Sequence, residues 1–162
     1  MPLLLRKIRQ ARWYDHKAVP WLPEGSLQAD ALSDLKTESN ALSMWQVQDD
    51  KSNLEDILTA LAAHCDGPAN LDYAIFDQDL LSAIGVEAKC APEGTTKAAV
   101  WHRALPELTA EKLMDLAGII MRHAKRERLP ERKIFSLVKG AVDRGEIPVV
   151  QLKPQWAMAI ST

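Results

Sequence analysis

Alternation of apolar and polar side chains on both sides of a polar connection is the feature of this chain that most constrains its fold. Every second residue is apolar or small from Leu27 to Leu35, and the same period returns from Ala41 to Val47. A period of two is typical of a β-strand with one buried face. The connection at 37–40 suits a turn, because it contains Asn40, which tolerates a left-handed backbone. We therefore predict an antiparallel hairpin near 27–48.

A third strand is needed, because an isolated two-stranded hairpin is only marginally stable in water. The candidates are residues 3–8 and residues 71–76, which are both rich in apolar side chains. The first candidate is ambiguous, since residues 6–12 also have good helix propensity. Trp13 and Trp21 flank a proline-rich loop, and both are predicted to hold it against the core.

Apolar residues at helical spacing predict that most of the remaining chain is helical. Ser52 and Glu55 match a capping box at the start of a helix that ends before Gly67-Pro68. A short helix is predicted from an Asp77 cap to Gly85. Longer helices are expected to begin at Thr109 and at Pro130, and one more turn near the end is expected to be anchored by Trp156. The apolar face of the first of these helices, which ends before Gly67-Pro68, consists of Leu54, Ile57, Leu58, Leu61 and Ala62.

These patterns together predict an α+β fold. A small antiparallel sheet, with its hairpin near 27–48, is expected to pack on helices, followed by a mainly helical C-terminal half. A length of 162 residues suits one domain, with an α+β part at 1–90 and a helical part at 91–162. No segment approaches the about 18 apolar residues of a membrane span, so a cytoplasmic protein without a membrane partner is predicted.

Charge is strongly partitioned along the chain, although the formal net charge is only −2. Residues 1–26 carry five basic and two acidic side chains, and residues 27–93 carry three basic and thirteen acidic ones. Residues 94–162 carry twelve basic and seven acidic side chains. Segregated charge of this kind acts on partners and on association kinetics more than on the fold.

The residues that could carry chemistry do not form a recognisable motif. His64, Cys65, Cys90 and His102 could ligate zinc, but they lack the close paired spacing that zinc sites usually have. No nucleophile elbow, dinucleotide-binding loop or phosphate-binding loop is present. The sequence therefore leads us to assign no catalytic residue, no metal ligand and no cofactor.

A nuclease is the third hypothesis for the function. Asp34-Leu35-Lys36 has the D-x-K form that, with an upstream acid such as Glu24 or Asp30, could hold a divalent cation beside a lysine. The same residues also fit the solvated face of an alternating strand, so the pattern remains a hypothesis.

A basic run near 122–133 is the strongest candidate for a binding surface. It lies across two predicted helices joined at Leu129-Pro130, which resembles the arrangement of a helix-turn-helix. Against this, acidic residues interrupt the run, and the calculated isoelectric point of 6.1 is low for a nucleic-acid-binding protein. The candidate binding residues are Arg122, Lys125, Arg126, Arg128, Arg132 and Lys133.

The sequence favours a non-enzymatic intracellular protein-interaction module with separate acidic and basic surfaces. Its partner is predicted to be a protein, with an acidic protein as the best fit to the basic run. The alternative is a nucleic-acid-binding protein that uses the basic helices around 122–133. The sequence leaves the oligomeric state open.

Overall fold

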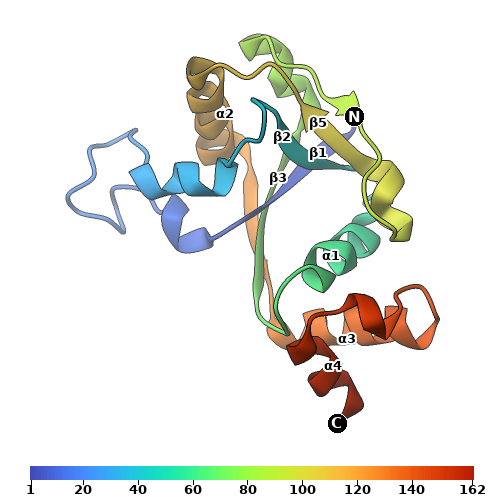
Figure 1. The fold of residues 1–162 in the computed structure, drawn as a ribbon. Helices are drawn as coiled ribbons and strands as arrows, with labels where there is room; N and C mark the ends of the chain where they lie inside the picture. Colours follow the sequence, from blue (N-terminus) through green and yellow to red (C-terminus); the bar gives the residue numbers. More distant parts are fainter.

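The computed structural model describes residues 1–162, and the chain is organised around one six-stranded antiparallel sheet (Figure 1). The strand order is β4-β5-β2-β1-β3-β6. β1 (Leu3–Ile8) lies between β2 (Leu42–Val47) and β3 (Leu71–Asp77). β5 (His102–Leu105) and β4 (Lys89–Cys90) extend one side, and β6 (Lys125–Leu129) forms the opposite edge. The predicted α+β fold with an antiparallel sheet is confirmed.

Four α-helices and five short 3-10 helices surround this sheet. The C-terminal part is largely helical, as predicted, and no helix is long and apolar enough to span a membrane. The α-helices are α1 (Leu54–Ala63), α2 (Ala110–His123), α3 (Glu131–Asp143) and α4 (Pro154–Ser161). The 3-10 helices are η1 (Gln10–Trp13), η2 (Ala29–Leu35), η3 (Gln78–Ile84), η4 (Lys97–Trp101) and η5 (Val149–Gln151).

The first arm of the predicted hairpin is wrong, because residues 29–35 form the helix η2 instead of a strand. Its buried residues are Ala31 and Leu35. The second arm is the strand β2, which pairs with β1 and β5. The turn between the arms is present, since Ser39 and Asn40 both adopt a left-handed backbone. The alternating pattern therefore identified one strand and one turn, but not the pairing.

Both candidates for a third strand are strands, and they pair with each other. The register of β1 and β3 runs from Leu3 opposite Asp77 to Ile8 opposite Asp72. β1 is extended because it is apolar on both faces: Leu4 and Leu5 are each fully buried, on opposite sides of the sheet. A helix at this position could not place one apolar side chain in the core on each side of the sheet.

Helical elements cover both faces of the sheet, so the molecule has three layers (Figure 1). On one face Leu4, Met44 and Phe76 pack with residues of η2, η3 and α2. On the other face the side chains of the strands pack with α1, α3 and the fully buried Trp156 of α4. The C-terminal helices therefore complete the same core that the N-terminal strands begin.

Most of the predicted helix boundaries are confirmed, because local interactions set them. The Asp77 carboxylate accepts a hydrogen bond from the Asp79 N–H, and the Thr109 hydroxyl accepts one from the Lys112 N–H. Gly85 ends η3 with a left-handed backbone, and Pro130 precedes α3. These four positions are typical of helix caps.

The predicted capping box at α1 is wrong. Asn53 is the N-cap residue, and its side chain makes no bond to the first turn of the helix. Its Oδ1 accepts from the Gln48 N–H at 2.9 Å, and its Nδ2 donates to the Gln46 carbonyl at 3.1 Å. Asn53 therefore ties the start of α1 to the end of β2. Leu58 is buried as expected, whereas Leu61 is only half-buried.

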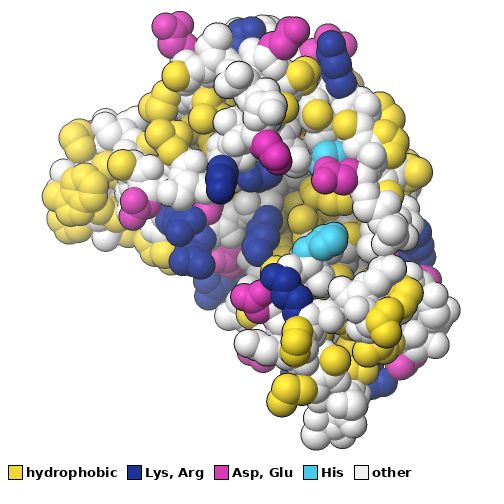
Figure 2. All heavy atoms as spheres, in the orientation of Figure 1, with side chains coloured by type: hydrophobic (Ala, Val, Ile, Leu, Met, Phe, Trp, Pro, Cys, Tyr) yellow, Lys and Arg dark blue, Asp and Glu magenta, His cyan; other side chains and the backbone are white.

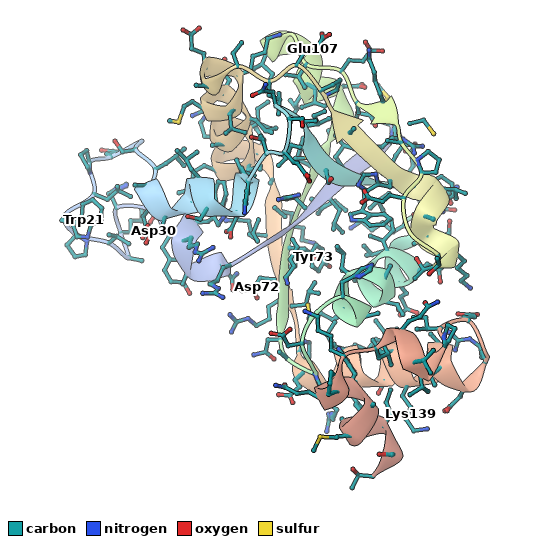
Figure 3. The ribbon with its side chains drawn as sticks, viewed as in Figure 1. Trp21, Asp30, Asp72, Tyr73, Glu107 and Lys139 are labelled. Atoms are coloured by element: carbon teal, nitrogen blue, oxygen red, sulfur yellow. The ribbon has the colours of Figure 1, made fainter.

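The two tryptophans that flank the proline-rich loop differ in burial. Trp13 is 1% exposed and belongs to the core, whereas Trp21 is 73% exposed at the tip of the loop (Figure 3). The neighbouring Leu22 is buried instead. The prediction was therefore right for Trp13 and wrong for Trp21.

Candidate functional site

The basic run near 122–133 does not lie on two helices joined by a tight turn. The strand β6 separates α2 from α3 and carries Lys125, Arg126 and Arg128 at the edge of the sheet. Arg122 lies in the last turn of α2, and Arg132 and Lys133 lie in the first turn of α3. The helix-turn-helix arrangement is therefore wrong for this segment.

Most cations of the basic run have partners within the protein. Arg126 donates from Nη1 to the Ile120 and Met121 carbonyls, at 3.1 and 2.9 Å, near the end of α2. Lys125 pairs with Glu127 at 2.8 Å, Arg128 with Asp72 at 2.7 Å, and Lys133 with Glu55 at 3.3 Å. Only the side chains of Arg122 and Arg132 make no hydrogen bond or ion pair. The run is therefore largely a set of structural contacts.

A different group of cations surrounds two neighbouring hollows at the end of β1. The hollows have volumes of 530 and 380 Å³ and share Lys7, Ile8 and Arg9 as lining residues. Together we call them the basic groove. Figure 2 shows Lys and Arg side chains gathered in this hollowed region, between the projecting N-terminal segment and the C-terminal helices. Its charged lining residues are Arg6, Lys7, Arg9, Arg12 and Lys153 with Asp34, Asp66 and Asp72.

Two carboxylates end β1 and shape the groove. The Arg9 N–H donates to Asp34 Oδ2, and the Gln10 N–H donates to Asp72 Oδ2, both at 2.9 Å. These bonds replace the strand pairing after Ile8, and η1 begins at Gln10. The chain therefore turns away from the sheet at this point and leaves the side chains of Lys7 and Arg9 exposed.

The turn after α1 and the start of α4 form the opposite wall. Gly67 is buried there, and a Cβ atom at this position would lie 2.8 Å from Gln155 Oε1. Only glycine allows this close approach without displacing α4. The packing brings Lys153, which pairs with Asp66 at 2.7 Å, to the rim of the groove.

Asp34 is a structural carboxylate in the floor of the groove. Its side chain is 8% exposed, and it accepts from Arg12 Nη1 at 2.7 Å and from Trp13 Nε1 at 2.8 Å as well as from the Arg9 N–H. The Asp34 carbonyl also accepts from Arg6 Nε at 2.9 Å. Four donors from residues 6–13 therefore converge on one residue of η2.

The proposed ligand set of a nuclease is not assembled around Asp34. Its oxygens face cations and N–H donors, and Glu24 and Asp30 are exposed on the projecting segment. No three His, Cys, Asp or Glu side chains in the protein lie close enough to hold a metal ion. His64 and Cys65 line the groove, whereas Cys90 and His102 lie in β4 and β5.

Three cations of the groove, Arg6, Lys7 and Arg9, form no ion pair with a carboxylate, and only Lys7 and Arg9 among them are exposed. Lys7 Nζ lies 3.2 Å from Cys65 Sγ, and the Arg9 side chain has no hydrogen bond or ion pair. Arg6 donates Nη1 to the Ser43 carbonyl at 2.7 Å, and burial holds the pKa of its guanidinium below the usual value. The groove thus contains five cations and three carboxylates, with its free positive charge at Lys7 and Arg9.

Asp72 closes the groove beside β6 (Figure 3). Its side chain is 8% exposed, and it accepts from Arg128 Nε at 2.7 Å and Nη2 at 3.1 Å. These bonds, together with the Gln10 N–H, hold the pKa of the Asp72 carboxyl below its usual value, and burial opposes them in part. The contact therefore stabilises the ionised form of Asp72.

Asp72→Asn is expected to reduce stability in a pH-dependent way. Because the folded pKa lies below the unfolded value of about 3.9, the stabilisation is fully present above that value and is lost as the pH falls through the folded pKa. The variant should lose about 1.5–3 kcal/mol at pH 7, as expected for bonds to a charged group. Urea unfolding at pH 7 and at about pH 3 measures the difference, which should shrink in acid.

The exposed Asp79→Asn is the matched control, since the Asp79 side chain makes no bond. Its stability should stay within about 0.5 kcal/mol of the wild type at both pH values. If Asp72→Asn lowers the free energy of unfolding equally at pH 7 and at about pH 3, the charge of Asp72 does not contribute to stability.

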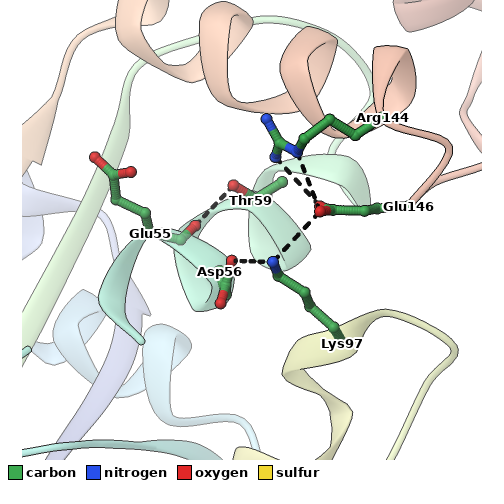
Figure 4. Close-up of polar contacts among 6 residues, drawn as sticks. All are labelled: Glu55, Asp56, Thr59, Lys97, Arg144 and Glu146. Carbon is green, nitrogen blue, oxygen red and sulfur yellow. Dashed lines mark hydrogen bonds and ion pairs between the residues drawn. The ribbon is translucent and has the colours of Figure 1, made fainter. Parts of the chain in front are cut away.

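A second cluster of charges is fully paired (Figure 4). Lys97 lies between Asp56 at 3.4 Å and Glu146 at 3.3 Å, and Arg144 pairs with Glu146 at 3.1 Å. The hydrogen bonds and charges of these acids raise the pKa of Lys97, while Arg144 and Lys97 lower the pKa of Glu146. The adjoining cavity holds only 20 Å³. This network joins α1, η4 and the end of α3, and offers little room for a ligand.

The residues of the basic groove were missed by the sequence analysis, because they are distant in the chain. Lys7 and Arg9 come from β1 and the residue that follows it, Asp66 from the turn after α1, and Lys153 from the residue before α4. The only sequence signal was the excess of basic residues in segment 1–26.

Comparison with known proteins adds no relative to this description. No protein-family model matches the chain, and searches of the curated proteins and of the solved structures found no significant match.

Proposed function

We propose that this protein is a non-enzymatic interaction module that binds an acidic protein segment in the basic groove. The observation that carries the proposal is the exposed pair Lys7 and Arg9, whose side chains form no ion pair with a carboxylate, at the junction of two open hollows. Cations held in a concave surface attract and orient an oppositely charged partner. Their position on the central strand and at its end makes this a rigid site.

The lining of the groove favours protein carboxylates over a nucleic acid. No Phe, Tyr or Trp lines either hollow, whereas single-stranded nucleic acids are usually held by stacking on aromatic side chains. Asp66, which is 79% exposed at the rim of the groove, would repel a phosphate backbone that follows the rim. Separate carboxylates of a peptide can bind Lys7 and Arg9 and avoid Asp66.

Lys7→Glu/Arg9→Glu is expected to abolish binding of an acidic probe. The probe is a fluorescent peptide of ten glutamates, and binding is measured by fluorescence anisotropy at low salt. Two charge reversals should weaken binding at least about tenfold, because the like charges then oppose the probe. Both side chains are exposed and lack carboxylate partners, so the variant should keep the wild-type thermal midpoint.

Arg122→Glu/Arg132→Glu is the matched control, with the same change of charge at two unpaired arginines of the basic run. It should bind the probe within about threefold of the wild type, a difference of under 1 kcal/mol. Equal losses in both double variants would show that only net charge matters and would overturn the proposal. Tighter binding of a single-stranded oligonucleotide at the same groove would overturn it in favour of a nucleic-acid ligand.

The two cysteines provide an independent readout of where the probe binds. Cys65 lines the groove, whereas Cys90 is exposed on β4. The probe should slow alkylation of Cys65 and leave the rate at Cys90 unchanged, which mass spectrometry of the modified peptides can follow. Unchanged alkylation of Cys65 at saturating probe would place the probe elsewhere.

A further inference from the structure

A group of carboxylates lies at the opposite end of β1 from the basic groove. Asp49 and Asp50 follow β2, Asp77 is the last residue of β3 and pairs with Leu3, and Asp79 lies two residues further on. The Gln78 N–H donates to the Pro2 carbonyl at 3.1 Å, and Gln46 Nε2 donates to Gln78 Oε1 at 2.7 Å. These bonds hold the two carboxylate pairs at one end of the sheet, which we call the acidic end.

The carboxylates of the acidic end are accessible to a partner. Asp49 is 62% exposed, and Asp50 and Asp79 are also exposed. Asp49 pairs with the Met1 ammonium group, whose charge also interacts with Asp77 and Asp79. Asp49, Asp50, Pro2 and Trp101 line an open hollow of 540 Å³ there. The acidic end therefore presents Asp49 and Asp50 in a hollow, with Asp79 exposed outside it.

The central strand separates the two charged ends. β1 is six residues long, so its ends lie about 17 Å apart, which is beyond the Debye length of about 8–10 Å at moderate salt. One copy of the protein therefore cannot neutralise its own groove with its acidic end. The formal net charge of −2 is also too small to keep copies apart by general repulsion.

We propose that the protein associates with itself head to tail, with the acidic end of one copy bound in the basic groove of the next. This inference rests on the proposed function of the groove and names its partner as a second copy of the chain. The interface joins unlike surfaces, so each dimer keeps one free groove and one free acidic end. Association is therefore open-ended, salt-sensitive and weakened by any acidic ligand of the groove.

Self-association is tested by sedimentation velocity of the full chain over a concentration series. The average mass should rise with concentration at about 20 mM salt and return to that of the monomer at about 500 mM salt. Lys7→Glu/Arg9→Glu and Asp49→Lys/Asp79→Lys should each remain monomeric at low salt. Asp79 makes no side-chain bond and Asp49 only an exposed ion pair, so the second variant should fold normally.

An equimolar mixture of the two variants is the decisive sample. Each variant keeps one intact surface, so the intact acidic end of the first should bind the intact groove of the second. The mixture should therefore associate although each variant alone stays monomeric, and it should pass beyond dimers, because the reversed groove with its two Glu side chains and the reversed end with its two Lys side chains also attract each other. The control variant Arg122→Glu/Arg132→Glu should associate like the wild type, and the ten-glutamate peptide should dissociate the wild-type assemblies.

The outcomes separate this inference from the proposed function. A wild-type protein that stays monomeric at low salt but binds the ten-glutamate peptide would refute self-association and leave the proposed function intact. Oligomers that form equally in the wild type and in both charge-reversed variants would also refute the head-to-tail contact. Loss of association in both charge-reversed variants, together with loss of peptide binding in the groove variant alone, would support both.

Discussion

Asp34→Ala is expected to lower the free energy of unfolding by about 2–4 kcal/mol, because the change removes the charged acceptor of a half-buried ion pair and of two further hydrogen bonds. The carboxylate accepts from the Arg9 N–H, Arg12 Nη1 and Trp13 Nε1, which would all lose their acceptor. Three unsatisfied donors beside the core cost more than the loss of one surface contact. Urea unfolding at pH 7 measures the change.

Asp30→Ala is the matched control for Asp34→Ala, since Asp30 lies in the same helix η2 but is exposed and makes no side-chain bond. Its effect should stay within about 0.5 kcal/mol. A loss of less than about 1 kcal/mol for Asp34→Ala would mean that water replaces the carboxylate at little cost. Other contacts would then fix the turn of the chain at the end of β1.

Trp13→Ala is the second change with a large expected effect, at about 3–5 kcal/mol. The side chain is 1% exposed and packs in the same cluster as Ile8, Ala31 and Leu35, so its removal leaves a cavity between β1 and η2. Trp13→Phe keeps most of the ring but removes the N–H bond to Asp34. It should therefore cost less, about 1–3 kcal/mol.

Trp21→Ala is the control for this prediction, because Trp21 lies in the neighbouring loop and is 73% exposed. Its stability should stay within about 0.5 kcal/mol of the wild type in the same urea experiment. Similar losses for Trp13→Ala and Trp21→Ala would contradict the difference in burial. A Trp13→Ala protein that is as stable as the wild type would show that η1 contributes little to the packing of η2 against the sheet.

The charged surfaces illustrate why functional residues were harder to predict than helices. Arg128 and Lys133 are close in sequence to other cations, yet their partners are Asp72 and Glu55, more than fifty residues away. Lys7 and Arg9 stand out much less in the sequence, but they carry the free charge of the basic groove. A run of cations indicates charge density, whereas free charge depends on which carboxylates fold against it.

The failed hairpin has a similar cause. The alternating residues of 27–35 are mostly small, and Ala31 and Leu35 are buried in the helix η2 as they would be on the inner face of a strand. The choice depends on Asp34, whose acceptor positions receive donors from residues 9, 12 and 13. Those donors are 21 to 25 residues away in the chain, beyond the reach of any local pattern.

The sequence by itself determined the elements whose stability is local: the helix starts at Thr109 and Pro130, the cap at Asp77, the left-handed turn at Asn40 and the α+β class. Their hydrogen bonds and backbone preferences involve residues only a few positions apart. Only the tertiary structure decided that η2 replaces a strand, that β6 separates α2 from α3, and that Lys7 and Arg9 stay unpaired. These outcomes depend on contacts between distant segments, because a charge or a donor is satisfied by whatever the fold places within a few ångströms of it.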